Sequence, residues 1–260
     1  MKLLIRNFFF ILSLLLNSSF VIAGEARIAA AASLTFVLEE ITDQFYKETG
    51  HRIKISYASS GTLTRQIEQG APFELFLSAD ESYIDRLIQQ QLTSDQNASG
   101  TIYAVGKLAI FNSSDQTQHI TSDLSSLGKS LKEKKIKHFS IPDPELAPYG
   151  RIAKQALETS GLWGGISPFL ITGENASQAA MFVSTGSVDG ALLPLSLAMI
   201  LEKKGLGNYQ LVAEDLYQPL KQRMVLLKNT GKITQSFYEY LLQPSAQKIF
   251  NKHGFGTVNY

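Results

Sequence analysis

Segments typical of β-strands alternate along the chain with segments typical of α-helices. Ile53, Ile55 and Tyr57 are separated by polar residues, as in a half-buried strand, and the apolar residues of 34–45 recur at helical spacing until Gly50. Proteins in which strands and helices alternate pack mostly parallel sheets between helices. The pattern therefore predicts an α/β fold.

The same patterns set the expected element boundaries. We predict strands at 28–32, 53–57, 75–77 and 101–111, and helices at 63–69, 81–91, 232–242 and 245–252, with Asp80 as the cap of the helix at 81–91. No internal repeat, low-complexity stretch or flexible linker interrupts them. If the chain forms two lobes, strands rather than a flexible tether are expected to join them.

The N-terminus has the pattern of a secretory signal. Lys2 and Arg6 precede a short apolar run, and small residues follow at Val21 and Ala23. The apolar run is shorter than the roughly 20 residues that span a bilayer, although a short membrane anchor remains an alternative. We expect cleavage after Ala23, or alternatively after Ala26, and export of the mature chain. Cleavage after Ala23 removes two of 24 basic residues and none of 23 acidic ones, which changes the formal charge from +1 to −1.

Composition excludes several classes of function. The chain has no cysteine, so it has neither disulfides nor a lipoprotein anchor cysteine. Its four histidines, which are His51, His119, His138 and His253, are far apart in sequence, so a histidine-rich metal site has no support. A nearly neutral chain without a basic run is a poor ligand for nucleic acid. We expect no nucleic-acid partner and no cofactor.

Three predicted junctions at helix starts share small and hydroxyl-bearing residues. These are Ser33, the group Ser59, Ser60, Gly61 and Thr62, and the group Asn175, Ala176 and Ser177. A helix N-terminus carries unpaired N–H groups and a partial positive charge, so it can bind an anion without a cationic side chain. Ser and Asn at these places can equally be ordinary helix caps. The residues alone leave both interpretations open.

Signals for catalysis are weak. Ser33 and Ser60 are not in a G-x-S-x-G motif, and the sequence "SSGT" lacks the G-K-[ST] ending of a phosphate-binding loop. Asp80, Glu81 and Asp85 are carboxylates near a helix start, where a capped and solvated first turn is the simpler interpretation. We therefore predict that the protein is not an enzyme.

Several motifs together resemble the periplasmic molybdate-binding proteins of ABC importers. They are "AAASLT", "ASSGTLTRQIEQGAPFELFLSAD", "YAVGKLAIF", "IPDPELAPYG" and "FNKHGFG", and they run in order from about Ile28 to Phe255. The resemblance implies a type II periplasmic binding protein fold of two lobes, each a mostly parallel sheet flanked by helices. It implies a signal peptide at 1–23, a first lobe from 24–104 plus 221–260, and a second lobe from 105–220.

The resemblance also implies a ligand, partners and a site. It implies a monomer that binds molybdate or tungstate and delivers it to a membrane permease. By position, Ser33 and Ser60 match the family's two serines, and Tyr149 and Ala176 match its backbone N–H donors. Some members place a tyrosine hydroxyl at the position of Leu193, which has no donor. Either that bond is absent here, or Asn175, Ser177 or Tyr149 replaces it.

A site lined only by hydrogen-bond donors suits a fully ionised oxyanion, which has only acceptor atoms. Hydrogen phosphate carries a proton and needs an acceptor, and the Ser33 and Ser60 motifs contain no carboxylate. Sulfate has the charge and shape of molybdate, so a binder of sulfate or thiosulfate is an alternative within the class. A secreted enzyme acting on phosphate esters, and an interaction protein whose serines only cap helices, are alternatives from other classes.

Overall fold

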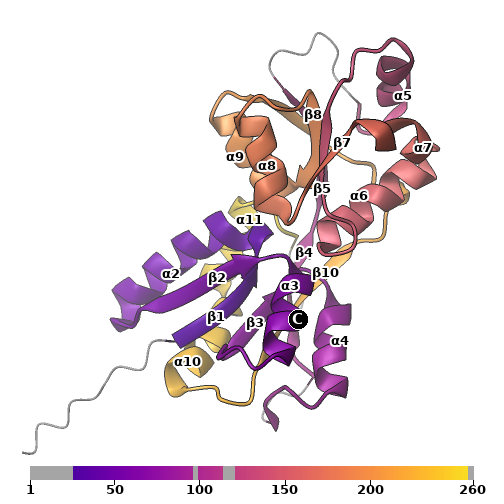
Figure 1. The fold of residues 1–260 in the computed structure, drawn as a ribbon. Helices are drawn as coiled ribbons and strands as arrows, with labels where there is room; N and C mark the ends of the chain where they lie inside the picture. The colour runs from indigo at the N-terminus through magenta and orange to yellow at the C-terminus, as the bar shows by residue number, and fades with distance from the viewer. Residues whose placement is uncertain (1–25, 96–98, 114–120, 257–260) are drawn as a thin grey trace, which may run out of the picture.

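The computed structural model describes residues 26–95, 99–113 and 121–256. In these residues strands and helices alternate as predicted, and the strands form two separate five-stranded sheets (Figure 1). The predicted signal peptide at 1–23 lies outside the described residues. Across the described part of the chain, no helix is both long enough and apolar enough to cross a membrane.

The first sheet combines strands from both ends of the described chain. Its strands are β1 (Ala26–Ala31), β2 (Ile53–Ala58), β3 (Leu75–Ser78), β4 (Thr101–Gly106) and β10 (Leu220–Leu226), in the order β2-β1-β3-β10-β4. Strand β1 is parallel to β2 and β3, whereas β10 is antiparallel to β3 and β4. Its helices are α2 (Thr35–Thr49), α3 (Ser60–Glu68), α4 (Glu81–Gln89), α10 (Lys232–Leu241) and α11 (Pro244–Lys252). We call this sheet and these helices the first lobe.

The second sheet uses only the middle of the chain. Its strands are β5 (Leu108–Ser113), β6 (Phe139–Pro142), β7 (Leu170–Gly173), β8 (Gly190–Pro194) and β9 (Gly207–Leu211), in the order β7-β6-β8-β5-β9. Its helices are α5 (Ser125–Lys132), α6 (Pro148–Thr159), α7 (Trp163–Ile166), α8 (Ala176–Ser184) and α9 (Leu195–Lys203). We call this sheet and these helices the second lobe. In both sheets the fourth strand in the order is antiparallel to its neighbours.

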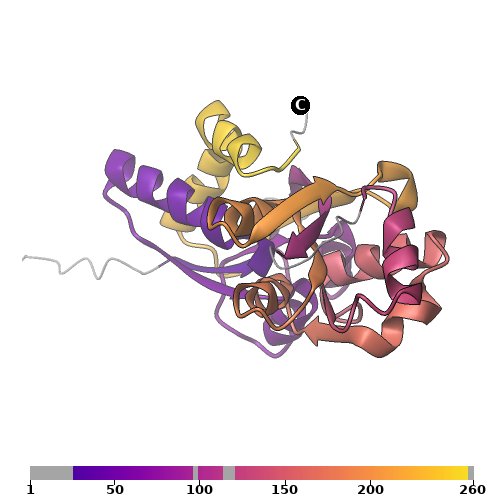
Figure 2. The same ribbon diagram turned by 90° about the horizontal axis from the view of Figure 1, so that it is seen from above.

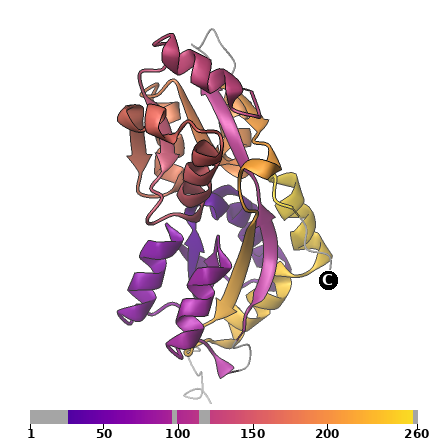
Figure 3. The ribbon, with the colours of Figure 1, turned by 90° about the vertical axis from the view of Figure 1, so that its right-hand side faces the viewer.

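The chain crosses between the lobes in two neighbouring places. One crossing is at Lys107, and the other lies between β9 and β10. The two are tied together, since the backbone N–H of Leu108 donates to the hydroxyl of Tyr217 at 3.2 Å. Figure 3 shows the ribbon from the side, with the two sheets one above the other. The predicted single strand at 101–111 was wrong, because β4 and β5 belong to different sheets. Continuous apolar runs stand on both sides of Gly106 and Lys107, so the sequence pattern gives no sign of the change of sheet.

The core confirms the predicted apolar face of α2. Val37, Leu38, Ile41 and Phe45 are buried, and burying each such side chain contributes roughly 1.5–3 kcal/mol. The ring of Phe45 meets that of Phe237 edge-on, with centroids 5.1 Å apart. This contact packs the C-terminal helices beside α2, and Figure 2 shows them (yellow) on the same side of the molecule as α2 (indigo).

Candidate anion-binding site

A small cavity lies where the two lobes meet. Ser33, Ser60, Tyr149 and Ala176, the four predicted ligand-binding residues, all line it. The start of α3 comes from the first lobe, and the starts of α6 and α8 come from the second (Figure 1). The cavity volume is about 10 Å³, which is roughly the space for one water molecule. Its lining is Ala31, Ala32, Ser33, Ala58, Ser59, Ser60, Ala79, Ala147, Pro148, Tyr149 and Ala176.

Ser33 lies in a 3-10 turn, Ala32–Leu34, between β1 and α2. Its side chain makes no cap bond to either helix, so the capping interpretation of this residue was wrong. The hydroxyl oxygen is buried and has no hydrogen-bond partner within the described residues. A buried polar group without a partner costs about 1–3 kcal/mol. This hydroxyl is therefore available to a polar ligand in the cavity.

Two neighbouring serines at the start of α3 have different partners. Ser59 is the helix cap, because its hydroxyl oxygen accepts from the backbone N–H of Thr62 at 3.3 Å. Ser60 is fully buried, and its hydroxyl oxygen accepts from the backbone N–H of Ala79 at 3.0 Å. Accepting that bond does not use the hydroxyl proton of Ser60. Ser60 can thus donate a hydrogen bond into the cavity.

The second lobe contributes backbone N–H groups. Tyr149 follows Pro148 in the first turn of α6, and Ala176 is the first residue of α8. First-turn N–H groups have no partner inside their own helix and lie at its positive end. The side chain of Asn175 caps α8 by accepting from the backbone N–H of Gln178 at 3.1 Å, and it does not line the cavity.

The side chain of Tyr149 forms a hydrogen bond close to the place where the chain crosses between the lobes. Its hydroxyl accepts from Nε2 of Gln222 at 3.1 Å, and Oε1 of Gln222 accepts from the hydroxyl of Tyr103 at 2.9 Å. Burial raises the pKa of the Tyr149 hydroxyl well above its usual range, so the group is neutral at physiological pH. Gln222 is fully buried and joins a tyrosine from each lobe.

Leu193 lies outside the cavity. It is a buried residue of β8, paired with Ala109 in the apolar core of the second lobe. Of the three residues considered as replacements for a donor there, Asn175 caps α8 and the Tyr149 hydroxyl is bonded to Gln222. The hydroxyl of Ser177 donates to the backbone carbonyl of Ala32.

Charged side chains are absent from the cavity lining. Asp80, next to Ala79, caps α4 as predicted by accepting from the backbone N–H of Ser82 at 2.8 Å. Its carboxylate also forms an ion pair with Arg151 of α6, which balances its charge. Asp85 pairs with Arg223 on the surface of the first lobe, at 2.7 Å. Over the described ranges, no three His, Asp or Glu side chains come together as a possible metal site.

Some contacts around the cavity have no counterpart in the sequence patterns. The backbone N–H of Gly61 donates to the carbonyl oxygen of Leu146 at 3.0 Å, which joins the lobes beside the cavity. The hydroxyl of Ser196 donates to the carbonyl oxygen of Ser33 at 2.9 Å. Local sequence could not indicate either contact, because each joins residues of different lobes.

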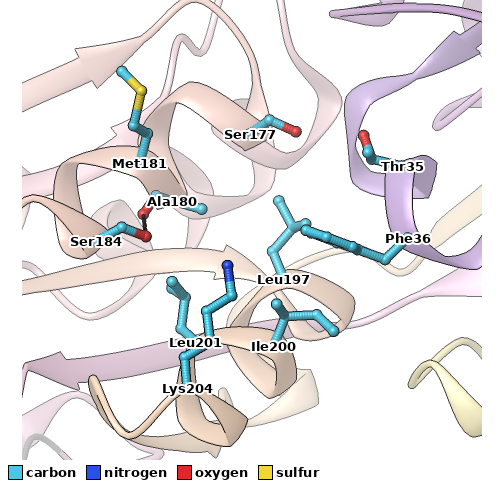
Figure 4. Close-up of a pocket in the computed structure, with 10 residues that line it drawn as sticks. All are labelled: Thr35, Phe36, Ser177, Ala180, Met181, Ser184, Leu197, Ile200, Leu201 and Lys204. Atoms are coloured by element: carbon cyan, nitrogen blue, oxygen red, sulfur yellow. Dashed lines mark hydrogen bonds between the residues drawn. The ribbon is translucent and has the colours of Figure 1, made fainter.

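A larger cavity nearby has a different character. Its volume is about 240 Å³, and it lies between α2 of the first lobe and α8 and α9 of the second (Figure 4). Its lining is Thr35, Phe36, Ser177, Ala180, Met181, Ser184, Leu197, Ile200, Leu201 and Lys204. The smaller cavity is the better candidate for an anion, because the unpartnered hydroxyl of Ser33, the hydroxyl of Ser60 and the first residues of α6 and α8 line it.

Comparison with known proteins identifies the family. The family described as "Bacterial extracellular solute-binding protein" matches residues 26–256. A protein of Rhodobacter capsulatus named "Molybdate-binding protein ModA" is 35% identical over 237 residues, which cover 90% of this chain and 89% of that protein. A protein of the same name from Escherichia coli (strain K12) is 31% identical over 245 residues, which cover 91% of this chain and 93% of that protein.

The fold agrees with a solved structure. The periplasmic molybdate-binding protein of Azotobacter vinelandii superimposes with a TM-score of 0.80 and 26% sequence identity, covering 90% of this chain and 100% of that one. The match includes both lobes, so it spans the cavity between them. The chain belongs to the bacterial extracellular solute-binding proteins, the family of ABC-transporter binding proteins with two lobes around a ligand.

Proposed function

We propose that this protein captures molybdate or tungstate in the periplasm and delivers it to the membrane permease of an ABC importer. The observation that carries the proposal is the buried hydroxyl of Ser33, which has no partner in the described residues and faces a cavity without charged side chains. The names and the full-length similarity of the relatives support the choice of ion. The proposed role is binding and delivery, without catalysis or a cofactor.

In the proposed site every contact to the ion is a donor. The hydroxyls of Ser33 and Ser60 donate from the first lobe, and the backbone N–H groups of Tyr149 and Ala176 donate from the second. Hydrogen phosphate would bring a proton into a lining that offers no carboxylate acceptor, and an unmade bond of this kind costs about 1–3 kcal/mol. Donor-only lining therefore favours a fully ionised tetrahedral oxyanion over phosphate.

Capture requires the lobes to move apart and close again. The residues that line the cavity come from both lobes, so separating the lobes opens a path for the ion. Donors from both lobes then contact the same ion, and the ion shifts the population towards the closed form. We propose lobe boundaries at 104/105 and 220/221, close to the two places where the chain crosses between sheets.

Processing and assembly are part of the proposal. We propose signal cleavage after Ala23 rather than after Ala26, because Ala26 is a buried residue of β1 paired with Ile53. Cleavage after Ala26 would remove one residue of that strand. We further propose that the mature protein works as a monomer.

Titration calorimetry tests the function directly. The mature protein, purified without added oxyanion, is titrated with molybdate, tungstate, sulfate and phosphate in turn. We expect tight binding of molybdate and tungstate and little or no binding of phosphate. Absence of binding to both molybdate and tungstate would refute the proposal. If sulfate bound more tightly than molybdate and tungstate, the protein would instead be a sulfate-binding protein.

A further inference from the structure

Two hydroxyls of the second lobe reach across to the turn that carries Ser33. The hydroxyl of Ser177 donates to the carbonyl oxygen of Ala32 at 3.1 Å, and that of Ser196 donates to the carbonyl oxygen of Ser33 at 2.9 Å. Ser177 is the second residue of α8, and Ser196 is the second residue of α9. Two helix starts are thus bonded to consecutive carbonyls of one turn.

These hydroxyls do not serve their own helices. Serines elsewhere in the second lobe bond back along the helix, as Ser184 does to the carbonyl of Ala180 at 3.3 Å and Ser160 to that of Ala156 at 2.7 Å. Figure 4 shows the contrast within α8, where Ser184 bonds to Ala180 and the hydroxyl of Ser177 points towards the segment that carries Thr35.

The carbonyl of Ala32 does not need the bond from Ser177 for local folding. Within the first lobe its oxygen already accepts from the backbone N–H of Thr35 and, at 2.9 Å, from the hydroxyl of Thr35. The positive end of a helix also favours the partial negative charge of a carbonyl oxygen. The bonds from Ser177 and Ser196 therefore stabilise the contact between lobes rather than either lobe.

The two serines touch the turn but not the cavity. Neither belongs to the lining of the small cavity, whereas Ser33 and Ala32 both do. Ser196 is 5% exposed, so its hydroxyl bond is shielded from competing water. Separating the lobes breaks both bonds and frees the turn that presents the Ser33 hydroxyl.

We infer that Ser177 and Ser196 are positioning residues for oxyanion capture, holding the lobes closed and fixing the turn that carries Ser33. The inference rests on the proposed function, which supplies the ligand. In the proposed scheme the ion leaves only after the lobes separate. A bond that exists only between closed lobes must break first, so removing it makes ligand release faster.

Alanine variants with matched controls test this inference. Ser177→Ala, Ser196→Ala and the double variant are compared with Ser184→Ala and Ser160→Ala in the mature protein. Molybdate affinity and its association and dissociation rates are measured, together with the melting temperature without ligand. We expect each single variant to lose roughly two- to tenfold in affinity, through faster dissociation. The controls and the Ser177→Thr variant, which keeps a hydroxyl, should bind like the wild type.

A distance measurement separates this inference from the proposed function. The chain has no cysteine, so spin labels can be attached at Lys47→Cys in the first lobe and Lys132→Cys in the second. We expect longer interlobe distances in the double variant than in the wild type. The inference would be overturned if the variants had the same interlobe distances and dissociation rates as the wild type. It would also be overturned if the loss of affinity were accompanied by an equal loss of stability in the ligand-free variants, because the serines would then have a purely structural role. If the wild type binds no molybdate, the proposed function fails, and distances in ligand-free protein still decide the role of the serines.

Discussion

The hydroxyl oxygen of Ser60 accepts a hydrogen bond from the backbone N–H of Ala79 at 3.0 Å, although the two residues are 19 positions apart. The bond fixes the side chain against the end of β3 and leaves its proton to point elsewhere. Since Ser60 is fully buried and lines the cavity, its hydroxyl can donate a hydrogen bond into the cavity.

Replacing Ser60 by alanine should weaken molybdate binding. A hydrogen bond to a charged group contributes about 1.5–3 kcal/mol, which corresponds to a loss of roughly 10- to 150-fold in affinity. Calorimetry on Ser60→Ala measures the loss, with Ser160→Ala as the control because that hydroxyl bonds within α6. Equal affinities of Ser60→Ala and the wild type would remove Ser60 from the site.

Gly61 should be required for closure of the lobes. A Cβ atom there would lie 2.8 Å from the carbonyl oxygen of Leu146 in the second lobe, a distance too short for real contacts. Within the first lobe the Cβ atom would lie 3.2 Å from the hydroxyl of Tyr83, the end of a side chain that can shift. Alanine also suits a helix better than glycine does, so we expect little loss of stability in the first lobe itself. We expect Gly61→Ala to weaken molybdate binding with little change in the melting temperature of the ligand-free protein.

The control for that variant is Gly164→Ala, because a Cβ atom at Gly164 meets nothing within 4 Å. Small-angle scattering in saturating molybdate should show a larger radius of gyration for Gly61→Ala than for either the wild type or the control. A closed, tightly binding Gly61→Ala protein would show that the lobes can shift to accept the methyl group.

Gly106 should be sensitive to any side chain. A Cβ atom there would collide with the Tyr149 hydroxyl and lie 2.7 Å from Nε2 of Gln222. Gly106→Ala is expected to lower the free energy of unfolding, and Tyr149→Phe in the same chain should restore part of the loss by removing the hydroxyl. Urea unfolding of the two single variants and the double variant gives the coupling. If the double variant lost as much unfolding free energy as the two single variants together, Gly106 and Tyr149 would not be in direct contact.

The carboxylate of Glu40 should make the free energy of unfolding fall as the pH is lowered in the acid range. Bonds from Lys252, at 2.8 Å, and from His253 hold the pKa of this carboxyl below its usual value of 4.5. A lowered pKa in the folded state contributes stability above about pH 4.5, and that contribution is lost as the pH falls through the folded value.

Glu40→Gln should therefore flatten part of the pH dependence of the unfolding free energy below about pH 4.5. The carboxylate is partly exposed, so an interaction of at most about 1 kcal/mol, weakened by salt, is expected. Urea titrations across this range in low and high salt provide the measurement. Parallel curves for the variant and the wild type would show that the contact adds no net stability.

Sequence patterns predicted the parts of the site that depend on local structure. Ser60 and Ala176 begin helices because Ser59 and Asn175 cap them, and such caps act within three residues. The family resemblance added Tyr149 at the start of α6, and the structure brings all four predicted residues to one cavity. For Ser33 the local interpretation was wrong, because the turn at 32–34 separates its side chain from α2.

The contacts between lobes could not be predicted in this way. Ser196 and Ser33 are 163 positions apart, and their bond depends on how two independently packed sheets meet. The same reason explains why the strand pattern joined β4 and β5, since the residues on both sides of Lys107 favour extended structure and only the choice of sheet differs. The lobe boundary near this place came from the family resemblance. Periodicity records which face of an element is buried, but it contains no information about which lobe buries it.

The place of β10 between β3 and β4 has a consequence for the order of folding. All strands of the second sheet lie within residues 108–211, whereas the first sheet lacks an inner strand until the chain has been made as far as Leu226. A domain whose contacts join distant parts of the chain must close long loops before those contacts stabilise it, so it folds slowly. A chain that emerges from its N-terminus can therefore assemble the second lobe first. During that interval the apolar edges of β3 and β4 need protection from aggregation.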